Sequence, residues 1–297
     1  MSRLVVTAPV ATVWTGPDAP RDVDAHAVAD APDVAGWAAA MPPEVRLGLH
    51  GRTLTQALVG EPVELLSEHG GWAHVVLPWQ PCASGPSGYP GWVRTAHLGP
   101  PPDADDDLLD DLVVVTASPG VTGSTRGEPV ALSYGTVLPR LAAVDGAVDG
   151  AVTVRLPNGR TARCDAGAVR PWPRPATVEA MLGAARLHLG LGYLWGGTSG
   201  WGLDCSGLVH LVLRAHGATV PRDAVDQQAV LPASDLREVR RGDLWFFARP
   251  GRPVHHVGWV SAPDGHLLHA PEGGTVEEAP IAAERAALLV SAGRPLG

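Results

Sequence analysis

The segment GYLWGGTSGWGLDCSGLVHLVLRAHG, residues 192–217, decides how the last part of the chain folds. Its first half contains too many glycines to form a stable helix. Its second half, from Cys205 onward, is apolar and predicts a buried helix that ends near Gly217. We therefore expect Cys205 at the first turn of a helix, directly after an extended glycine-rich segment.

The elements on either side of this segment predict an α+β domain. Before it, Thr177 can cap a helix that runs to about residue 190, with Met181 and Leu182 among its apolar positions. After it come three stretches that predict successive antiparallel strands: GDLWFFA (242–248), HHVGWVSA (255–262) and GHLLHAP (265–271), the last two joined by a turn at 263–265. Helices followed by a strand meander are typical of an α+β fold.

The chain before this domain predicts two small all-β barrels of one type. Short apolar runs alternate with Gly and Pro turns, as in RLVVTAPVATVW (3–14), GYPGWVRTAHL (88–98) and AVTVRLPNGRTARC (151–164). In the first barrel, Asp33 and Pro43 mark an N-cap and a first-turn proline of two inserted helices. In the second, Asn158-Gly159 predicts a hairpin turn.

These patterns divide the chain into three expected domains, of which the last is 173–297. The first barrel with its helical insertion is expected at 1–102 and the second barrel at 103–172, with an acidic linker at 103–107 and a Pro-rich hinge at 170–177.

Composition excludes several classes of function. The net charge is −9 and no basic stripe is present, which argues against a nucleic-acid partner. No uninterrupted apolar run reaches the length of about 18 residues that a membrane span needs, and we expect a cytoplasmic protein. The chain contains three widely spaced cysteines, so neither a disulfide framework nor a structural zinc site is expected.

Cys205 is the candidate nucleophile. Free N–H groups at a helix N-terminus stabilise a thiolate, and we expect them to lower the pKa of this thiol and to receive an oxyanion. A lone cysteine is most often a buried structural residue, which is how we interpret Cys82 and Cys164. A thiolate–imidazolium pair would give a bell-shaped pH profile.

His256 is the candidate base. Side chains alternate along a strand, so His255 and His256 point to opposite faces. Gly258 shares the face of His256 and would let another element come close, which favours His256 as the inward residue. The next strand brings His269, which can orient the imidazole of His256. A Cys/His/His metal site is the rival interpretation and is disfavoured, and no cofactor is expected.

The motifs of the last domain resemble the NlpC-type family of papain-like cell-wall peptidases. They are YLWGG (193–197), DCSG (204–207), PRD with a glutamine (221–227), GDLWFF (242–247), HVG (256–258) and HAP (269–271). The resemblance implies a papain-like core that hydrolyses D-γ-glutamyl bonds. It also implies that Cys205, His256 and His269 form the catalytic triad and that Tyr193 lines the site and assists the oxyanion.

The whole chain resembles a subgroup in which two bacterial SH3-like barrels precede the peptidase. In that subgroup the tyrosine of GYPGW, here Tyr89, closes one end of the cleft. This implies specificity for a free N-terminal L-Ala-γ-D-Glu-diamino acid, whose ammonium needs anionic and hydroxyl neighbours. Residues matching that pocket are Asp204, Ser206 and Asp223, with Glu61 as a further candidate. The family usually has Ser after PRD, and here position 224 is Ala.

Three classes of function follow from this comparison. The first is a cysteine endopeptidase that recycles peptidoglycan-derived peptides in the cytoplasm, and for which we expect no metal and a monomeric state. The second is a cell-wall-binding protein in which the SH3-like barrels dominate. The third is an acyltransferase or amidase on the same fold, because a thioester can pass to an amine as well as to water.

Overall fold

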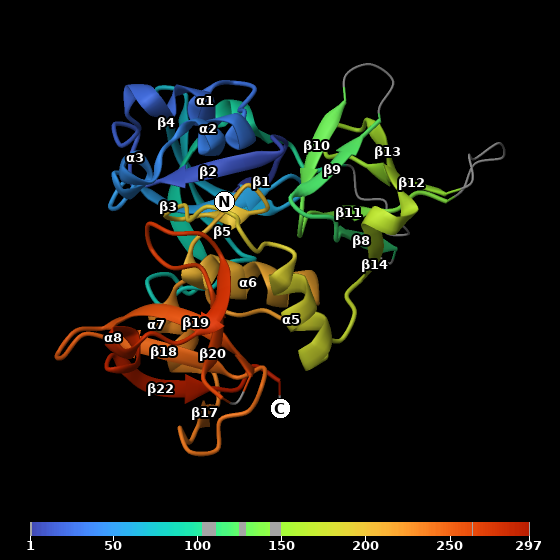
Figure 1. Cartoon of the computed structure of the whole chain (residues 1–297). Coiled ribbons are helices and arrows are strands. Elements are labelled where there is room, and N and C mark those ends of the chain that lie inside the picture. Colours follow the sequence, from blue (N-terminus) through green and yellow to red (C-terminus); the bar gives the residue numbers. More distant parts are fainter. Residues whose placement is uncertain (1, 103–110, 125–128, 143–149, 263, 297) are drawn as a thin grey trace.

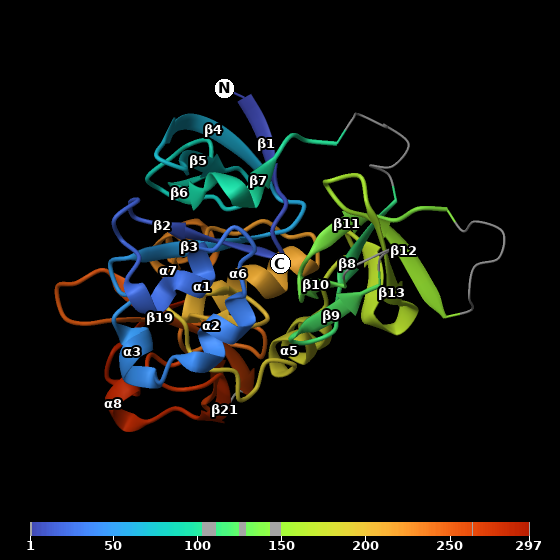
Figure 2. The same cartoon turned by 90° about the horizontal axis from the view of Figure 1, so that it is seen from above.

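The computed structural model describes residues 2–102, 111–124, 129–142, 150–262 and 264–296. Figure 1 shows two strand-rich units, coloured blue to cyan and green, and a C-terminal domain coloured yellow to red. In the view from above, the first unit lies over the C-terminal domain and the second lies beside both (Figure 2). The acidic run predicted as a linker, 103–107, is outside the described residues.

The first strand-rich unit is built on a seven-stranded antiparallel sheet. Its strand order is β3-β2-β6-β5-β4-β1-β7. Strands from both ends of this order contribute side chains to one hydrophobic core, so the sheet curls around it. The strands are β1 (Ser2–Val6), β2 (Val10–Trp14), β3 (Thr53–Leu58), β4 (Pro62–His69), β5 (Trp72–Leu77), β6 (Tyr89–Arg94) and β7 (Leu98–Gly99).

Three short helices are inserted between β2 and β3, of which the sequence predicts the second and the third. They are α1 (Ala25–Val28), α2 (Val34–Ala40) and α3 (Pro43–Leu47). The Asp33 carboxylate accepts a hydrogen bond from the Gly36 N–H at 2.8 Å, and Pro43 opens α3, so both predicted helix starts are confirmed. Arg46 on α3 donates to the carbonyl of Tyr193 at 3.4 Å, which ties the insertion to the C-terminal domain.

The second unit has three small sheets around its own core. Isolated bridges at Ser124–Arg163 and Arg140–Val154 connect the sheets to one another. The turn predicted at Asn158-Gly159 is confirmed between β12 and β13, with Gly159 at φ 77°. The strands are β8 (Leu112–Val115), β9 (Gly120–Gly123), β10 (Val130–Ser133), β11 (Val137–Pro139), β12 (Ala151–Arg155), β13 (Thr161–Asp165) and β14 (Val169–Trp172). That both units are SH3-like barrels with the expected boundaries stays a prediction.

The C-terminal domain has the predicted α+β architecture. Its main sheet has six strands in the order β17-β22-β18-β19-β20-β21. The three predicted strands are neighbours in it, and Thr177 caps α5 through the N–H of Ala180 at 3.2 Å. The elements are α5 (Val178–Arg186), β15 (Thr198–Ser199), β16 (Gly202–Leu203), α6 (Cys205–Ala215), α7 (Ala224–Val230), β17 (Ala233–Ser234), β18 (Leu244–Ala248), β19 (Val254–Ala262), β20 (His266–His269), β21 (Glu277–Pro280), α8 (Ala283–Ala286) and β22 (Leu289–Gly293). The turn predicted at 263–265 includes residue 263, which is outside the described residues.

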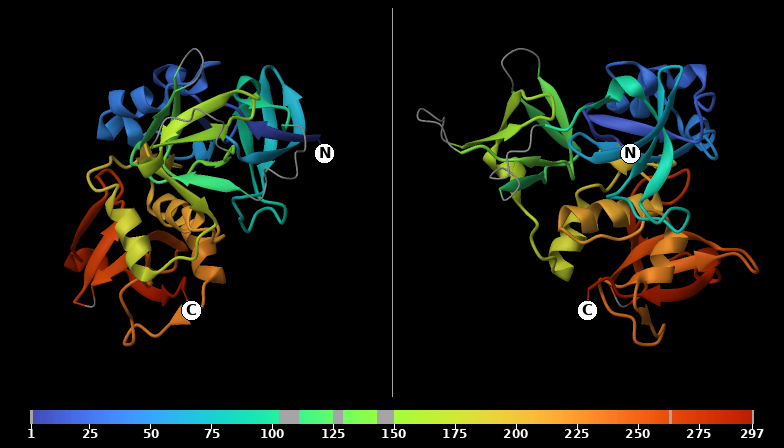
Figure 3. Two further views of the ribbon diagram at one scale, coloured as in Figure 1. Left: turned by 90° about the vertical axis from the view of Figure 1, so that its right-hand side faces the viewer. Right: turned by 180° about the vertical axis from the view of Figure 1, so that it is seen from behind.

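Helix α6 is the buried centre of the molecule. All of its residues are buried, and both views of Figure 3 show it between the strand-rich units and the C-terminal sheet. Its last carbonyls are capped from the second unit, because Arg170 donates to Ala215 at 2.9 Å and Trp172 donates to Arg214 at 2.8 Å. No helix in the described part of the chain is both long enough and apolar enough to cross a membrane.

Buried polar contacts join the first unit to α6. Glu61, between β3 and β4, forms an ion pair with Arg214 at 2.6 Å, with 2% and 6% of the two side chains exposed. The same carboxylate accepts from the Leu58 N–H at 2.8 Å and from Gln80 at 3.2 Å. Each of these buried charges is compensated only while the first unit and α6 remain in contact.

We expect loss of the Glu61 charge to destabilise the protein. Glu61→Gln leaves Arg214 buried without its counter-charge and should lower the free energy of unfolding by about 3 kcal/mol, measured by urea denaturation. The double variant Glu61→Leu/Arg214→Met, which removes both charges, should recover part of this loss. Asp111→Asn is the control, since its pair with Arg140 is about half exposed and should change stability by less than about 1 kcal/mol. Equal losses in Glu61→Gln and the control would contradict the expectation.

Candidate active site

Cys205 is the first residue of α6 and faces strand β19. Only 6% of it is exposed, and its Sγ lies 3.9 Å from the carbonyl oxygen of His255. The N–H groups of Val257 and Ser206 also point toward the sulfur. Since His255 and Val257 flank His256, the candidate nucleophile lies against the segment of β19 that carries the candidate base.

The two candidate catalytic histidines are in hydrogen-bond contact. His256 is 4% exposed whereas His255 is exposed, so the prediction that His256 points inward is confirmed. His256 Nε2 and His269 Nδ1 are 2.8 Å apart. Gly258 permits this approach, since a Cβ at that position would lie 2.8 Å from the Cβ of His269.

A carboxylate stands at the far end of this pair. Glu277 is opposite His269 in the β20–β21 ladder, and its Oε1 lies 3.2 Å from His269 Nε2. A carboxylate here favours a proton on Nε2 of His269, which leaves Nδ1 to accept from His256 Nε2. The remaining nitrogen of His256, Nδ1, is then the one free to take a proton from a thiol.

The expectation of a lowered cysteine pKa is wrong for this structure. Burial, and then the negative charge of Asp204, raise the pKa of Cys205 to about 12, which outweighs the N–H groups near the sulfur. Burial likewise lowers the pKa of His269 to about 3 and that of His256 well below 6.5. Burial thus opposes charge on both the thiol and the imidazole, the reverse of the shift that would favour a thiolate–imidazolium pair.

Asp204 and Ser206 are occupied by a buried arginine. Asp204 caps α6 through the Gly207 N–H at 2.7 Å, and Arg222 contacts both of its oxygens at 2.7 and 3.0 Å. Arg222 also donates to Ser206 Oγ at 3.0 Å and is 0% exposed. Both predicted pocket residues therefore have an anchoring role that the sequence analysis did not assign.

Tyr89 and Asp223 meet across the boundary between the first unit and the C-terminal domain. The Tyr89 hydroxyl donates to Asp223 Oδ2 at 2.8 Å, while the ring packs in the core of the first unit. Burial raises the pKa of Asp223, and the positive charge of Arg222 opposes this. Ala224, which follows, is buried and supplies no hydroxyl.

The assignment of Glu61 to the amine pocket is corrected by the structure. Its partner Arg214 is on the last turn of α6, nine residues after Cys205. This separation is roughly 13 Å along a helix. The carboxylate is thus neutralised at the other end of α6 and stabilises the interface.

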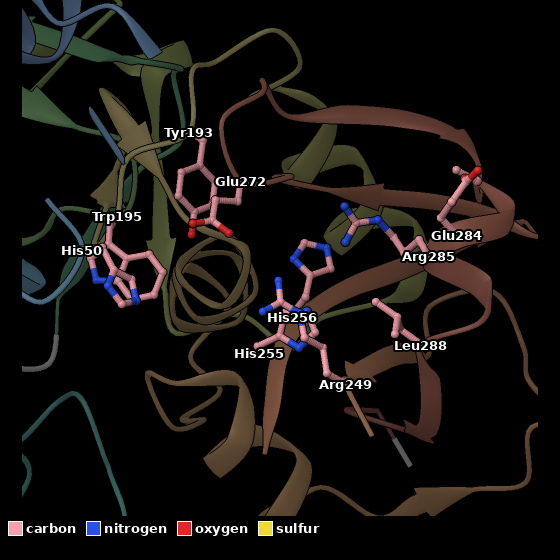
Figure 4. A pocket seen from close by; sticks show the side chains of 11 residues that line it. His50, Tyr193, Trp195, Arg249, His255, His256, Glu272, Glu284, Arg285 and Leu288 are labelled. Atoms are coloured by element: carbon pink, nitrogen blue, oxygen red, sulfur yellow. The ribbon is translucent and has the colours of Figure 1, made fainter. Parts of the chain in front are cut away.

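A cavity of about 680 Å³ is lined in part by His256, the candidate base. Its walls include Tyr193 and Trp195 from the glycine-rich segment and His50 from the first unit, whose ring lies 4.1 Å from that of Trp195. Figure 4 shows these side chains on one side and Arg285 and Leu288 on the other, with His255 and His256 between them. Burial raises the pKa of Tyr193, so its hydroxyl stays protonated and can donate.

Several residues of the site were missed by the sequence analysis. Arg222 belongs to the PRD motif, yet no spacing pattern connects it with Asp204. His50, Arg249 and Arg285 lie outside the quoted motifs, so no local signal could have identified them.

Comparisons with known proteins agree with this geometry. A model of the NlpC/P60 family matches residues 190–287. The chain is 34% identical over 278 residues to a Bacillus subtilis (strain 168) protein named gamma-D-glutamyl-L-lysine dipeptidyl-peptidase, which covers 92% of this chain and 91% of that protein. A Bacillus cereus protein of the same name is 32% identical over 91% of this chain and 83% of its own length. The crystal structure of an NlpC/P60 family protein from Bacillus cereus has a TM-score of 0.93 at 29% identity, with all of both chains covered.

We expect Cys205 to react slowly with alkylating agents at neutral pH. Because its pKa is raised to about 12, the thiolate fraction should grow roughly tenfold per pH unit from pH 7 to 9. The rate of iodoacetamide labelling should rise in parallel, followed by mass spectrometry of the Cys205 peptide. The partly exposed Cys82 serves as an internal control. Nearly equal Cys205 labelling at pH 6 and pH 8 would instead indicate a preformed thiolate.

Proposed function

The chain belongs to the NlpC/P60 family of cysteine peptidases, and on this premise we propose that it hydrolyses the γ-D-Glu-diamino acid bond of peptidoglycan-derived peptides that carry a free N-terminal L-Ala. The observation that carries the proposal is the series formed by Cys205, His256 and His269 in a site that the first unit partly encloses. The names of the two Bacillus relatives support γ-D-glutamyl specificity.

In the proposed reaction, His256 takes the Cys205 proton as the sulfur attacks the γ-carbonyl carbon of D-Glu. The N–H groups at the start of α6 and the Tyr193 hydroxyl stabilise the oxyanion. The C–N bond then breaks, and the protonated His256 donates its proton to the leaving amine. Water, deprotonated by His256, hydrolyses the thioester and restores the thiol.

Selection of a free amine would come from the contact between Tyr89 and Asp223. The Tyr89 hydroxyl donates to Oδ2 of Asp223, which leaves Oδ1 with no hydrogen bond from the described residues. An ammonium group placed there gains a charge-assisted hydrogen bond at a partly buried site. Asp204 and Ser206 would support this pocket through Arg222, whereas Ala224 offers it no hydroxyl.

The proposed setting is the recycling of wall peptides by a cytoplasmic monomer. Cell fractionation of a tagged chain and sedimentation of the purified protein test these two expectations.

Peptide cleavage tests the proposed function. We expect L-Ala-γ-D-Glu-L-Lys and its diaminopimelate counterpart to release L-Ala-D-Glu, detected by liquid chromatography and mass spectrometry, and their N-acetylated forms to resist. Cys205→Ala should abolish cleavage. Equal cleavage of the blocked peptides would remove amine selection from the proposal. No cleavage of any peptide, together with binding to isolated peptidoglycan sacculi, would favour a binding module. Product formation only with an added amine would favour an acyltransferase.

The Tyr89 hydroxyl should contribute to amine selection without taking part in the chemistry. Tyr89→Phe leaves Asp223 without its donor and should raise KM for free peptides about tenfold while kcat changes little. Tyr134→Phe, which removes a hydroxyl in the second unit, is the matched control. A loss confined to kcat would show that Tyr89 acts in another way.

A further inference from the structure

Two arginines face the cavity from its outer wall. Arg249 directly follows β18, and Arg285 is on α8. The Arg285 guanidinium lies 5.9 Å from the ring centre of Phe247, which is itself 5.6 Å from the ring centre of His256. Figure 4 shows the Arg285 guanidinium directed toward the histidines. A fixed positive charge is therefore held close to the reacting centre.

Neither arginine is neutralised by the protein in the described part of the chain. No ion pair in that part of the chain includes Arg249 or Arg285. Both guanidinium groups are therefore more than 4 Å from any carboxylate oxygen of the described residues. Glu284 and Glu272 also line the cavity, but Figure 4 shows Glu284 pointing away from the Arg285 guanidinium and Glu272 beside Tyr193. Other surface arginines of this domain do have such partners, among them Arg186 with Glu278 and Arg294 with Asp243.

The electrostatic effects of the two arginines agree with their placement. After burial, the positive charges of Arg249 and Arg285 lower the pKa of His255, and Arg285 also lowers the pKa of His256 and His269. Both guanidinium groups thus act on the same small volume of the cavity.

We propose that Arg249 and Arg285 form a carboxylate-binding subsite that positions the substrate peptide at the scissile bond. An arginine guanidinium binds a carboxylate through two parallel N–H donors, which fixes orientation as well as charge. The inference rests on the proposed function, whose peptides carry carboxylates on both sides of the scissile bond. One is the α-carboxylate of D-Glu, and the others belong to the diamino acid.

The subsite is separate from the contact that is proposed to select the amine. Tyr89 and Asp223 do not line this cavity, whereas His256 does. A peptide whose ammonium meets Asp223 and whose γ-carbonyl meets Cys205 would therefore extend toward the two arginines. The polarity of the site matches that of the peptide, with an anion for its N-terminus and cations for the carboxylates beyond it.

Substrate variants distinguish which carboxylate is bound. We expect Arg285→Gln, and more strongly Arg249→Gln/Arg285→Gln, to raise KM by about 10-fold to 100-fold for a peptide that carries the bound group. The peptides compared are L-Ala-γ-D-Glu-L-Lys, its D-isoglutamine analogue, its C-terminal amide, and the meso-diaminopimelate peptide. The increase in KM should be absent for the analogue that lacks the recognised carboxylate. If the arginines bind the second carboxylate of diaminopimelate, the increase should occur only for the diaminopimelate peptide.

Control variants separate recognition from other effects. Arg252→Gln removes the same charge from an exposed residue near the cavity that does not line it, and should leave KM unchanged. Arg285→Lys should restore charge without the two-donor geometry and give an intermediate KM. An increase in KM that is equal for all four peptides would reflect only the pKa of His256 and would overturn the proposal. Wild-type KM values in the double variant Arg249→Gln/Arg285→Gln would overturn it as well.

Binding measurements keep this inference distinct from the proposed function. In the Cys205→Ala background, calorimetry should show weaker peptide binding when both arginines are replaced. If the wild type cleaves none of the peptides but this difference persists, the proposed reaction fails and the subsite stands. If cleavage occurs but binding does not depend on the arginines, the subsite fails alone.

Discussion

The buried ion pair between Asp204 and Arg222 holds the active site together. Arg222 is fully buried and contacts both oxygens of Asp204, while its Nε donates to Thr55 of the first unit at 2.9 Å. The same carboxylate accepts from the N–H of Gly207 at 2.7 Å and from that of Gly196 at 2.9 Å. An unpaired buried charge is costly. The contacts of Asp204 and Arg222 therefore fix the start of α6, the glycine-rich segment and the first unit relative to one another.

This anchoring has a chemical consequence for the nucleophile. The Asp204 charge that caps α6 also lies beside Cys205 and, like burial, raises the pKa of the thiol. In the proposed reaction, attack by Cys205 is therefore coupled to proton transfer to His256, whose pKa is lowered by burial. In that reaction, the position of His256, which contacts with His269 and Glu277 fix, would matter more than the acidity of the thiol.

The sequence was sufficient where the signal was local. Helix starts at Asp33, Thr177 and Cys205 follow from short-range rules, and strand alternation together with Gly258 selected His256 over His255. The partners of the charged groups could not be predicted in the same way. Their contacts join residues that are far apart in the chain and have no periodic relation, as for Glu61 with Arg214. The prediction that the pKa of Cys205 is lowered was wrong for the same reason, because burial is a property of the packed structure.

The first unit belongs to the site and is not only attached to it. Thr55 accepts a hydrogen bond from Arg222, and the Tyr89 hydroxyl donates one to Asp223. His50 lines the cavity. A module that served only to anchor the enzyme to the wall would not need buried hydrogen bonds to the catalytic domain, since these fix its orientation. Under the proposed function, Tyr89 and Asp223 would meet one end of the bound peptide and the two arginines the other, so charge rather than apolar area would set which peptide binds and in which direction it lies.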